Sequence, residues 1–272
     1  MSEGVQIAPV LGLPEFTEGM SVGAEIAARA EIEDGDVVVI SQKVVSKAEG
    51  QVRHLSSVLP GAEARKLAAV LGREPALIEL ILEQSAEVLR AERGVLIVET
   101  HHGLVCANAG IDSSNLPEPD TVCLLPEDPD ASARSIRSEI TTAIAGELGM
   151  GVAGHSPLFS ADPHPQLPPT IAVVISDSFG RAWRLGQAEV AIGCAGLAPL
   201  DDWRGRSDSA GRKLEATLIA VADEAAAAAD LVRDKASGMP VAIVRGLGHH
   251  VGTEDGSGAA ALRRPRDQDL FR

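Results

Sequence analysis

Two continuous runs of β-branched and apolar residues are the strongest hydrophobic signals in the chain. Residues 37–40 are Val-Val-Val-Ile after an Asp-Gly-Asp turn signal, and residues 171–175 are Ile-Ala-Val-Val-Ile. Runs without polar alternation indicate strands that are buried on both faces. Shorter apolar runs predict further strands at 5–13, 121–125 and 240–244, and a β-hairpin from 95–100 and 103–107.

Helical spacing of apolar residues predicts helices between these strands, at 21–30, 62–71, 75–92, 128–149 and 213–237. Asp128 before Pro129 has the form of an N-cap followed by proline at the first helical position. Residues 180–196 fit no single element, and residues 151–169, rich in Gly, Pro, Ser and His, are expected to form a surface insertion. Strands and helices alternate, with one hairpin between them. This order predicts a mixed α/β (α+β) fold with mixed sheets.

The composition argues against several classes of function. The 272 residues include 24 Lys+Arg and 39 Asp+Glu, a formal charge of −15, and 45% of them are hydrophobic. An acidic surface argues against nonspecific nucleic-acid binding and against docking on anionic lipid. No apolar run reaches the roughly 18 residues of a membrane span, and the N-terminus has no secretory pattern. Three separated cysteines without a CxxC indicate a reduced, cytoplasmic protein without structural zinc or disulfides.

Two acidic residues follow apolar segments and are candidates for metal binding. Asp177 and Ser178 come just after the run 171–175, where α/β proteins place ligand sites, and an Asp beside a hydroxyl suits Mg²⁺. Asp112 lies in the tight sequence Gly-Ile-Asp-Ser-Ser-Asn at 110–115. The alternatives are an N-cap or Asx-turn at Asp177 and an ordinary turn at Asp112.

Lysine is scarce, and its distribution is informative. The chain has five lysines, and two of them, Lys43 and Lys47, lie in the heptapeptide 41–47. A solvated strand end would explain the pair, but two carboxylates, a cation and lysine are also the components of phosphoryl transfer. The sequence has no Walker A motif, kinase glycine loop or GxGxxG, which makes a P-loop protein, a kinase or a Rossmann dehydrogenase improbable.

Two arginines, Arg181 and Arg184, flank Trp183 downstream of Asp177. Guanidinium groups match phosphate and carboxylate oxygens, although surface packing of the Trp is an equal alternative. The adjacent pairs His101-His102 and His249-His250 are not expected to chelate a metal, because neighbouring side chains in a strand or loop point apart.

Together these motifs resemble those of the γ-glutamyl ligases of the deazaflavin coenzyme F420, in family order and over nearly the whole chain. The segments that carry the resemblance are 13–16, 34–47, 110–115, 177–184, 222–224 and 240–246. Residues 269–271 resemble the end of the ligase half of the two-domain actinobacterial enzymes, without their nitroreductase-like half. The resemblance implies one ligase domain over 1–272, with two interleaved subdomains as a further option, and an intertwined homodimer.

The resemblance also implies a reaction. A GTP- and divalent-metal-dependent ligase would phosphorylate the carboxylate of F420-0, and the amine of L-glutamate would attack the acyl phosphate. Later rounds would extend a γ-linked glutamate tail. The implied cofactors are Mg²⁺ or Mn²⁺, with K⁺ as an additional candidate. The alternatives are a related ligase for another acid or amino acid, and a metal- and nucleotide-binding regulator without ligase activity.

By match to the family motifs, the nucleotide positions are Leu13, Pro14, Glu15, Phe16, Gln42, Lys47, Asn115 and Lys235, and the metal positions are Asp112, Asp177 and Ser178. The candidate catalytic residues are Lys47, Arg181 and Arg184, and Lys47 rather than Lys43 is expected to point into the site. Lys235 stands where many archaeal members appear to carry a glutamine that ligates a second metal. An ammonium group cannot ligate a cation. Either Lys235 supplies the positive charge itself, or other groups bind the second metal ion.

Overall fold

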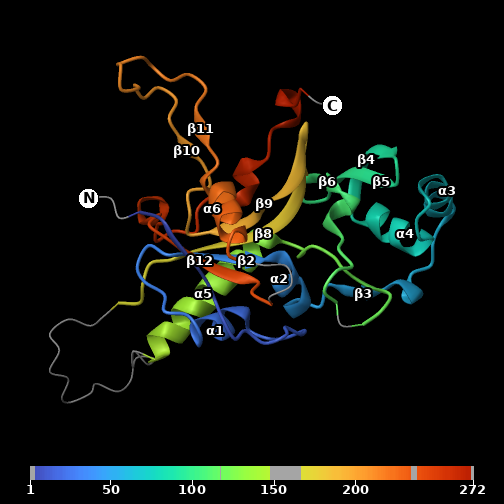
Figure 1. The fold of residues 1–272 in the computed structure, drawn as a ribbon, viewed down its shortest axis with the longest axis horizontal. Coiled ribbons are helices and arrows are strands. Elements are labelled where there is room, and N and C mark those ends of the chain that lie inside the picture. The colour runs from blue at the N-terminus through green and yellow to red at the C-terminus, as the bar shows by residue number, and fades with distance from the viewer. Residues whose placement is uncertain (1–3, 117, 148–166, 234–237, 271–272) are drawn as a thin grey trace.

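A five-stranded mixed sheet forms the centre of the protein (Figure 1). The computed structural model describes residues 4–116, 118–147, 167–233 and 238–270. The strands lie in the order β1 (Gln6–Pro9), β12 (Val241–Arg245), β2 (Val37–Ser41), β8 (Ala172–Arg181) and β9 (Arg184–Ala195). β2 and β8 are parallel, and the other neighbouring pairs are antiparallel. The two β-branched runs of the sequence are therefore adjacent central strands.

Helices cover both faces of this sheet. The helices on one face are α1 (Val22–Ala27), α2 (Gln42–Ala48) and α5 (Pro129–Glu147), and α6 (Val221–Asp230) lies on the other face. Val38 and Ile40 of β2 pack in the first core cluster, whereas Val37 and Val39 pack with α6. Both faces of β2 are thus buried, which explains the absence of polar residues before Ser41. The predicted start of α5 is confirmed, since the Ala131 N–H donates to Asp128 Oδ1 at 2.9 Å.

A second, smaller sheet has its own hydrophobic core at one end of the molecule (Figure 1). Its strands are β4 (Ser85–Glu92), β5 (Val95–Thr100) and β6 (Val105–Ala107), and α3 (Ala62–Leu71) and α4 (Pro75–Glu83) pack with it. β3 (Val52–His54) pairs with β7 (Thr121–Cys123) between the two sheets. Within the described parts of the chain, no helix is both long and apolar enough to cross a membrane.

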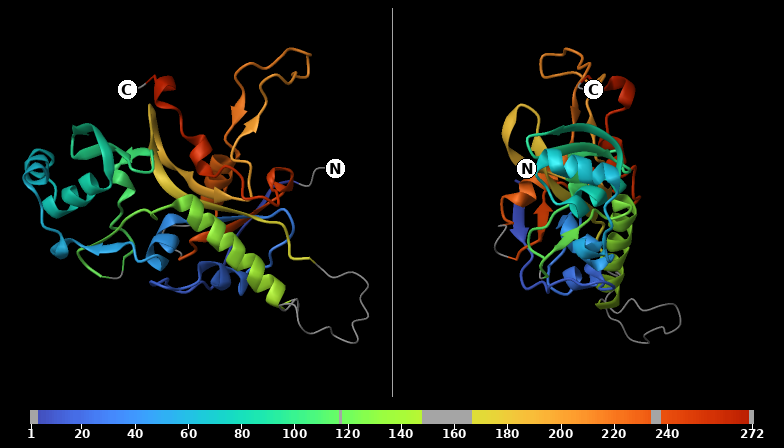
Figure 2. Two further views of the ribbon diagram at one scale, coloured as in Figure 1. Left: turned by 180° about the vertical axis from the view of Figure 1, so that it is seen from behind. Right: turned by 90° about the vertical axis from the view of Figure 1, so that its right-hand side faces the viewer.

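A narrow arm projects from the opposite side of the central sheet (Figure 2). β10 (Asp201–Asp202) and β11 (Leu218–Ile219) pair at its base. Short 3₁₀ helices complete the described elements, at Leu55–Ser57, Asn108–Gly110, Gly248–His250, Ala259–Leu262 and Arg266–Gln268.

The predicted fold class is confirmed, but the structure corrects several segments. The helix predicted over 75–92 ends at Glu83, and the rest of that segment is β4. Register shifts between Ser85 and Glu87 and between Val88 and Arg90 disturb the period-2 pattern of this strand, so helical spacing also fits its sequence. The helix predicted over 213–237 begins only at Val221, because the preceding residues return along the arm.

The segment 180–196 that fitted no single element is the tip and second strand of the β8–β9 hairpin. Residues 151–166 of the expected insertion at 151–169 lie outside the described part of the chain.

Close contact between β9 and the start of α5 leads to a stability prediction. A Cβ atom at Gly193 would lie 2.2 Å from the carbonyl oxygen of Pro129, whereas a Cβ at Gly146 in α5 would meet nothing within 4 Å. Gly193→Ala should therefore lower the free energy of unfolding by about 1–3 kcal/mol, the usual cost of overpacking. As a control, Gly146→Ala should raise it by roughly 0.5–1 kcal/mol because alanine favours the helix. Urea unfolding measures both changes, and an unchanged midpoint for Gly193→Ala would contradict the close β9–α5 contact.

Candidate functional site

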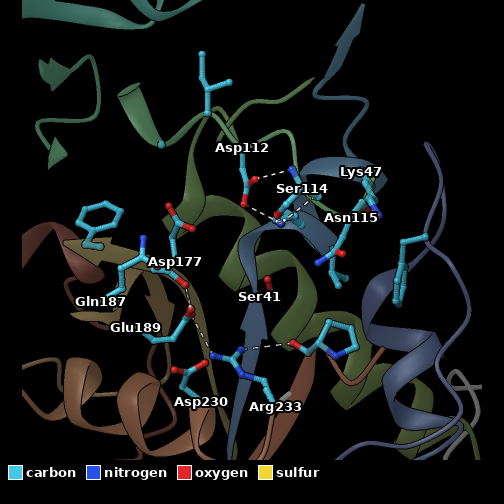
Figure 3. A pocket seen from close by; sticks show the side chains of 18 of the residues that line it. Ser41, Lys47, Asp112, Ser114, Asn115, Asp177, Gln187, Glu189, Asp230 and Arg233 are labelled. Carbon is cyan, nitrogen blue, oxygen red and sulfur yellow. Dashed lines mark hydrogen bonds and ion pairs between the residues drawn. The ribbon is translucent and has the colours of Figure 1, made fainter. Parts of the chain in front are cut away.

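A pocket of about 750 Å³ opens at the carboxyl ends of β2 and β8 (Figure 3). Ser41 pairs with Ser176 at this end of the parallel strands. The pocket is lined by residues 13–16, Ser41, Lys43, Val44 and Lys47, most of 106–115, residues 177–180, Gln187, Glu189, Asp230, Arg233 and residues 238–240. Segments far apart in the sequence thus meet at one edge of the sheet.

Both lysines of the heptapeptide 41–47 line this pocket. Ser41 ends β2, and both lysines belong to α2, which begins at Gln42 directly after it. Residues four apart lie on the same side of a helix, so Lys43 and Lys47 both face the pocket. The expectation that Lys47 alone would enter the site is therefore wrong.

Each lysine has an acidic partner. Lys43 Nζ lies 2.7 Å from Asp112 Oδ2 and also donates to the Ser114 hydroxyl at 2.7 Å. Lys47 forms an ion pair with Glu15 and donates to the Asn115 carbonyl oxygen at 3.2 Å. The two ammonium groups are thus held against the N-terminal segment and the Asp112 loop, on one side of the pocket.

The loop before Asp112 has an unusual backbone. Asn108, Ala109 and Gly110 have consecutive positive φ values of 53°, 54° and 71°. Non-glycine residues reach this region at a cost of roughly 1–2 kcal/mol each, and such strain is concentrated at functional sites. After the turn, the Asp112 backbone pairs with Cys123, and Asp112 Oδ1 accepts from the Ser114 N–H at 2.7 Å. The predicted tight loop is confirmed, and it fixes the direction of the Asp112 carboxylate.

Asp177 belongs to β8 itself rather than to a loop after the strand, since β8 continues to Arg181. Burial raises the pKa of Asp177 to about 7; the backbone N–H of Ser178 opposes this rise, and the negative charges of Glu189 and Asp112 add to it. At Asp112, burial acts in the same direction, but hydrogen bonds from Lys43 and Ser114 outweigh it and lower the pKa. Asp112 is therefore paired with Lys43, whereas Asp177 forms no ion pair with any of the residues that the structure describes.

These oxygen donors fit a hard divalent cation. Figure 3 shows the carboxylates of Asp112 and Asp177 on neighbouring sides of the pocket, with Ser178 also among its lining residues. A cation would favour the ionised form of Asp177, which burial now disfavours. The described residues contain no cluster of three or more His, Cys, Asp or Glu suited to a metal. Hydroxyl, water or substrate oxygens would therefore complete the coordination, as is usual for Mg²⁺.

The floor of the pocket contains charged residues that the sequence did not reveal. Glu189 of β9 and Arg233, which follows α6, form a buried ion pair at 3.1 Å. Ser176 and Ser178 both donate to Glu189, at 2.6 and 2.5 Å. Glu189 lies in the segment that fitted no predicted element, and Arg233 lies in the helix predicted too long. Neither position belonged to a recognisable motif.

The structure brings most of the predicted site residues together. Those that line the pocket are Leu13, Pro14, Glu15, Phe16, Lys47, Asp112, Asn115, Asp177 and Ser178. Gln42 is buried beside it, and its side-chain oxygen accepts from Ser46 at 2.8 Å. Lys235 lies outside the described residues.

Arg181 and Arg184 are not brought to this pocket. They lie at the exposed tip of the β8–β9 hairpin, and Arg181 donates to the Leu185 carbonyl oxygen at 2.8 Å. Neither arginine is among the residues that line the pocket, and their catalytic role stays a prediction.

The fold and the pocket define an α/β protein in which carboxylates and lysines from distant segments meet at one edge of the central sheet. A family model described as F420-0:Gamma-glutamyl ligase matches residues 11–156 and 165–246. The chain therefore belongs to the F420-0:gamma-glutamyl ligase family.

Relatives of similar length support this membership. The chain is 39% identical over 270 residues to the coenzyme F420:L-glutamate ligase of Methanothermobacter thermautotrophicus, covering 99% of this chain and 97% of that protein. It is 36% identical over 264 residues to the protein of the same name from Methanocaldococcus jannaschii, covering 96% and 95%. With that of Archaeoglobus fulgidus the identity is 38% over 244 residues, covering 89% and 88%.

The pKa of Asp177 is raised and that of Asp112 is lowered, so replacing each carboxyl by an amide should change the stability of the metal-free protein in opposite directions. The folded-state pKa of Asp177, about 7, exceeds its ordinary value of 3.8, so ionising Asp177 costs stability. This cost is absent below about pH 4, grows as pH rises, and is complete above pH 7. At pH 8 in EDTA, Asp177→Asn should therefore be more stable than the wild type, by at most about 4 kcal/mol at roughly 1.4 kcal/mol per pKa unit.

Asp112→Asn is the matched control. Because the folded-state pKa of Asp112 is lowered, its stabilising contribution is present above about pH 4 and is lost as pH falls. This variant should be less stable than the wild type at pH 8. Urea unfolding at pH 5 and pH 8 measures both variants, and a destabilised Asp177→Asn at pH 8 would contradict the raised pKa of the Asp177 carboxyl.

Proposed function

We propose that this protein is a GTP- and divalent-metal-dependent ligase that joins L-glutamate to F420-0 through an acyl phosphate. The observation that carries the proposal is the convergence of Asp112, Asp177, Lys43 and Lys47 in one pocket. Paired carboxylates for a cation and lysines for phosphate oxygens are the groups that phosphoryl transfer needs. The names of the relatives supply the substrates, F420 and glutamate. Further rounds would extend the γ-linked tail.

Asp112 and Asp177 would hold the metal, Mg²⁺ or Mn²⁺, with Ser178 as an additional or second-ion ligand. When bound, such an ion stabilises negative charge on the phosphoryl oxygens and on the attacked carboxylate. The lysines contribute charge of their own at the other side of the pocket. Lys47, beside Asn115 and Glu15, would contact the nucleotide phosphates. Lys43 would turn from Asp112 to a phosphate oxygen once a cation takes its place at that carboxylate.

Other parts of the proposal concern assembly. An intertwined homodimer is proposed from the resemblance, and it would give Arg181 and Arg184 a route to a nucleotide in the partner's pocket. The exposed hairpin tip supports such a contact, because Trp183 beside them is 81% exposed. Lys235 and K⁺ remain candidates for additional positive charge near the phosphates.

The test is mass spectrometry of F420-0 incubated with the protein, GTP, L-glutamate and Mg²⁺. The expected product is heavier by one glutamyl residue, and GTP is converted to GDP and phosphate only when both the acid and the amine are present. Asp112→Asn and Asp177→Asn should abolish turnover while retaining cooperative unfolding. GTP binding without acid-dependent turnover would favour a regulator, and turnover only with another acid or amine would favour a related ligase.

The placement of both lysines leads to a kinetic prediction. Lys43→Met and Lys47→Met should each lower kcat by on the order of 10²–10³, the usual effect of removing one group that stabilises transition-state charge. Lys66→Met is the matched control, since Lys66 lies exposed on α3, away from the pocket, and its removal should leave kcat unchanged. Wild-type turnover by Lys43→Met would mean that its ammonium serves only to neutralise Asp112.

A further inference from the structure

Both carboxylate oxygens of Glu189 accept hydrogen bonds in the pocket floor. The side chains of Glu189 and Arg233 are 8% and 6% exposed. Glu189 Oε1 accepts from Ser178 Oγ at 2.5 Å, and Oε2 accepts from Ser176 Oγ at 2.6 Å and from Arg233 at 3.1 Å. Figure 3 shows Glu189 and Arg233 below Asp177. Burying an ion pair is costly and often adds no stability, so its presence at the pocket floor calls for another explanation.

The sheet fixes these side chains in place. Ser178 lies directly opposite Glu189 in the antiparallel register of β8 and β9. Ser176, two residues earlier on β8, shares its face, because side chains alternate along a strand. Arg233 approaches from the end of α6 and is within 3.0 Å of the Ser176 hydroxyl. Glu189 is therefore anchored from three directions, and its distance from Ser178 is set by backbone pairing.

This anchoring determines what Ser178 can offer to the pocket. A serine hydroxyl has one proton and two lone pairs. The Ser178 proton is committed to Glu189, so only lone pairs remain for a ligand in the pocket. A group of this kind binds a cation and disfavours direct contact with an anion. Arg233 meanwhile neutralises Glu189, so that the glutamate serves as a hydrogen-bond acceptor rather than as a competing cation ligand.

We infer that Glu189, held by Arg233, is a positioning residue that orients the Ser178 hydroxyl as a metal ligand. The inference rests on the proposed function, because it needs a cation in this pocket. Residues behind a metal ligand commonly set its orientation, and their loss typically lowers metal affinity by about 10–100-fold. Glu189 acts through Ser178 and does not touch the metal.

Glu189→Gln tests this directly. At the Oε2 position the side chain faces two donors, Ser176 and Arg233, so the amide oxygen of the glutamine must lie there. The amide nitrogen then faces Ser178 and donates to its hydroxyl. The Ser178 proton is released and can turn into the pocket, where it opposes a cation. The substitution keeps the size of the side chain, reverses the hydrogen bond to Ser178 and removes the negative charge that pairs with Arg233.

The measurement is titration of the full-length protein with MnCl₂, followed by electron paramagnetic resonance of free Mn²⁺, with and without GDP. Glu189→Gln should weaken Mn²⁺ binding at the Ser178 site about 10–100-fold. Ser178→Ala should do the same, and the double variant should bind no more weakly than Ser178→Ala alone, since both changes remove one interaction. Ser178→Thr keeps the hydroxyl and should bind Mn²⁺ like the wild type.

Asp223→Asn is the matched structural control. Asp223 is also a carboxylate that holds β9, through the Ala191 N–H at 2.9 Å, but it does not line the pocket. The asparagine keeps an oxygen acceptor for this N–H, so the variant should fold and bind Mn²⁺ with wild-type affinity. If Glu189→Gln does not fold, Glu189→Asp replaces it, because the shorter carboxylate cannot reach Ser178 and Arg233 together.

Two results would overturn the inference alone: wild-type Mn²⁺ affinity in the folded Glu189 variant, or additive effects of the Glu189 and Ser178 substitutions. Failure of the wild-type protein to bind Mn²⁺ would instead overturn the metal requirement of the proposed function, and the inference with it. Loss of ligase activity in the Glu189 variant with unchanged Mn²⁺ binding would point to a structural role and reject the inference.

Discussion

The parallel pairing of β2 with β8 is the constraint on which the pocket depends. It places Ser41 opposite Ser176, so the chain leaves β2 into α2 beside the point where β8 reaches Asp177. Lysines and a carboxylate from distant segments thereby share one edge of the sheet, which is where α/β folds bind ligands. A slip of one residue in β8 would turn Asp177 to the opposite face. The apolar side chains on both faces of the two strands oppose such a slip, because it would move each β8 side chain from the core cluster on one face of the sheet to the cluster on the other.

Three ion pairs balance part of the charge of the pocket. Lys43 pairs with Asp112, Lys47 with Glu15, and Arg233 with Glu189. Asp177 forms no ion pair with any residue in the described ranges, and burial raises its pKa to about 7. Under the proposed function, a divalent cation would supply the missing positive charge and would let an acidic protein admit a polyanionic ligand at this edge.

The sequence predicted the parts of this site that depend on local patterns. The two β-branched runs, the Asp112 loop and Asp177 were all recognisable, because buried strands and tight turns have strong signatures. Lys43 was misjudged because the helix α2 over Gln42–Ala48 was not predicted, and residues four apart in a helix lie on one side of it. Glu189 was missed because its role comes from cross-strand register with Ser178, a pairing between residues 11 positions apart that no local motif encodes.

Exposure separates the ion pairs of the pocket into two kinds. The Glu189 and Arg233 side chains are 8% and 6% exposed, so separating them would leave two buried charges without partners, at a high cost. Lys43 is 18% exposed and its partner Asp112 is 38% exposed, while Glu15, the partner of Lys47, is 64% exposed. Water can solvate these carboxylates when they separate, so such pairs contribute little to stability. The lysines can therefore exchange a carboxylate for a ligand oxygen, whereas Arg233 stays in place and keeps the floor of the pocket rigid.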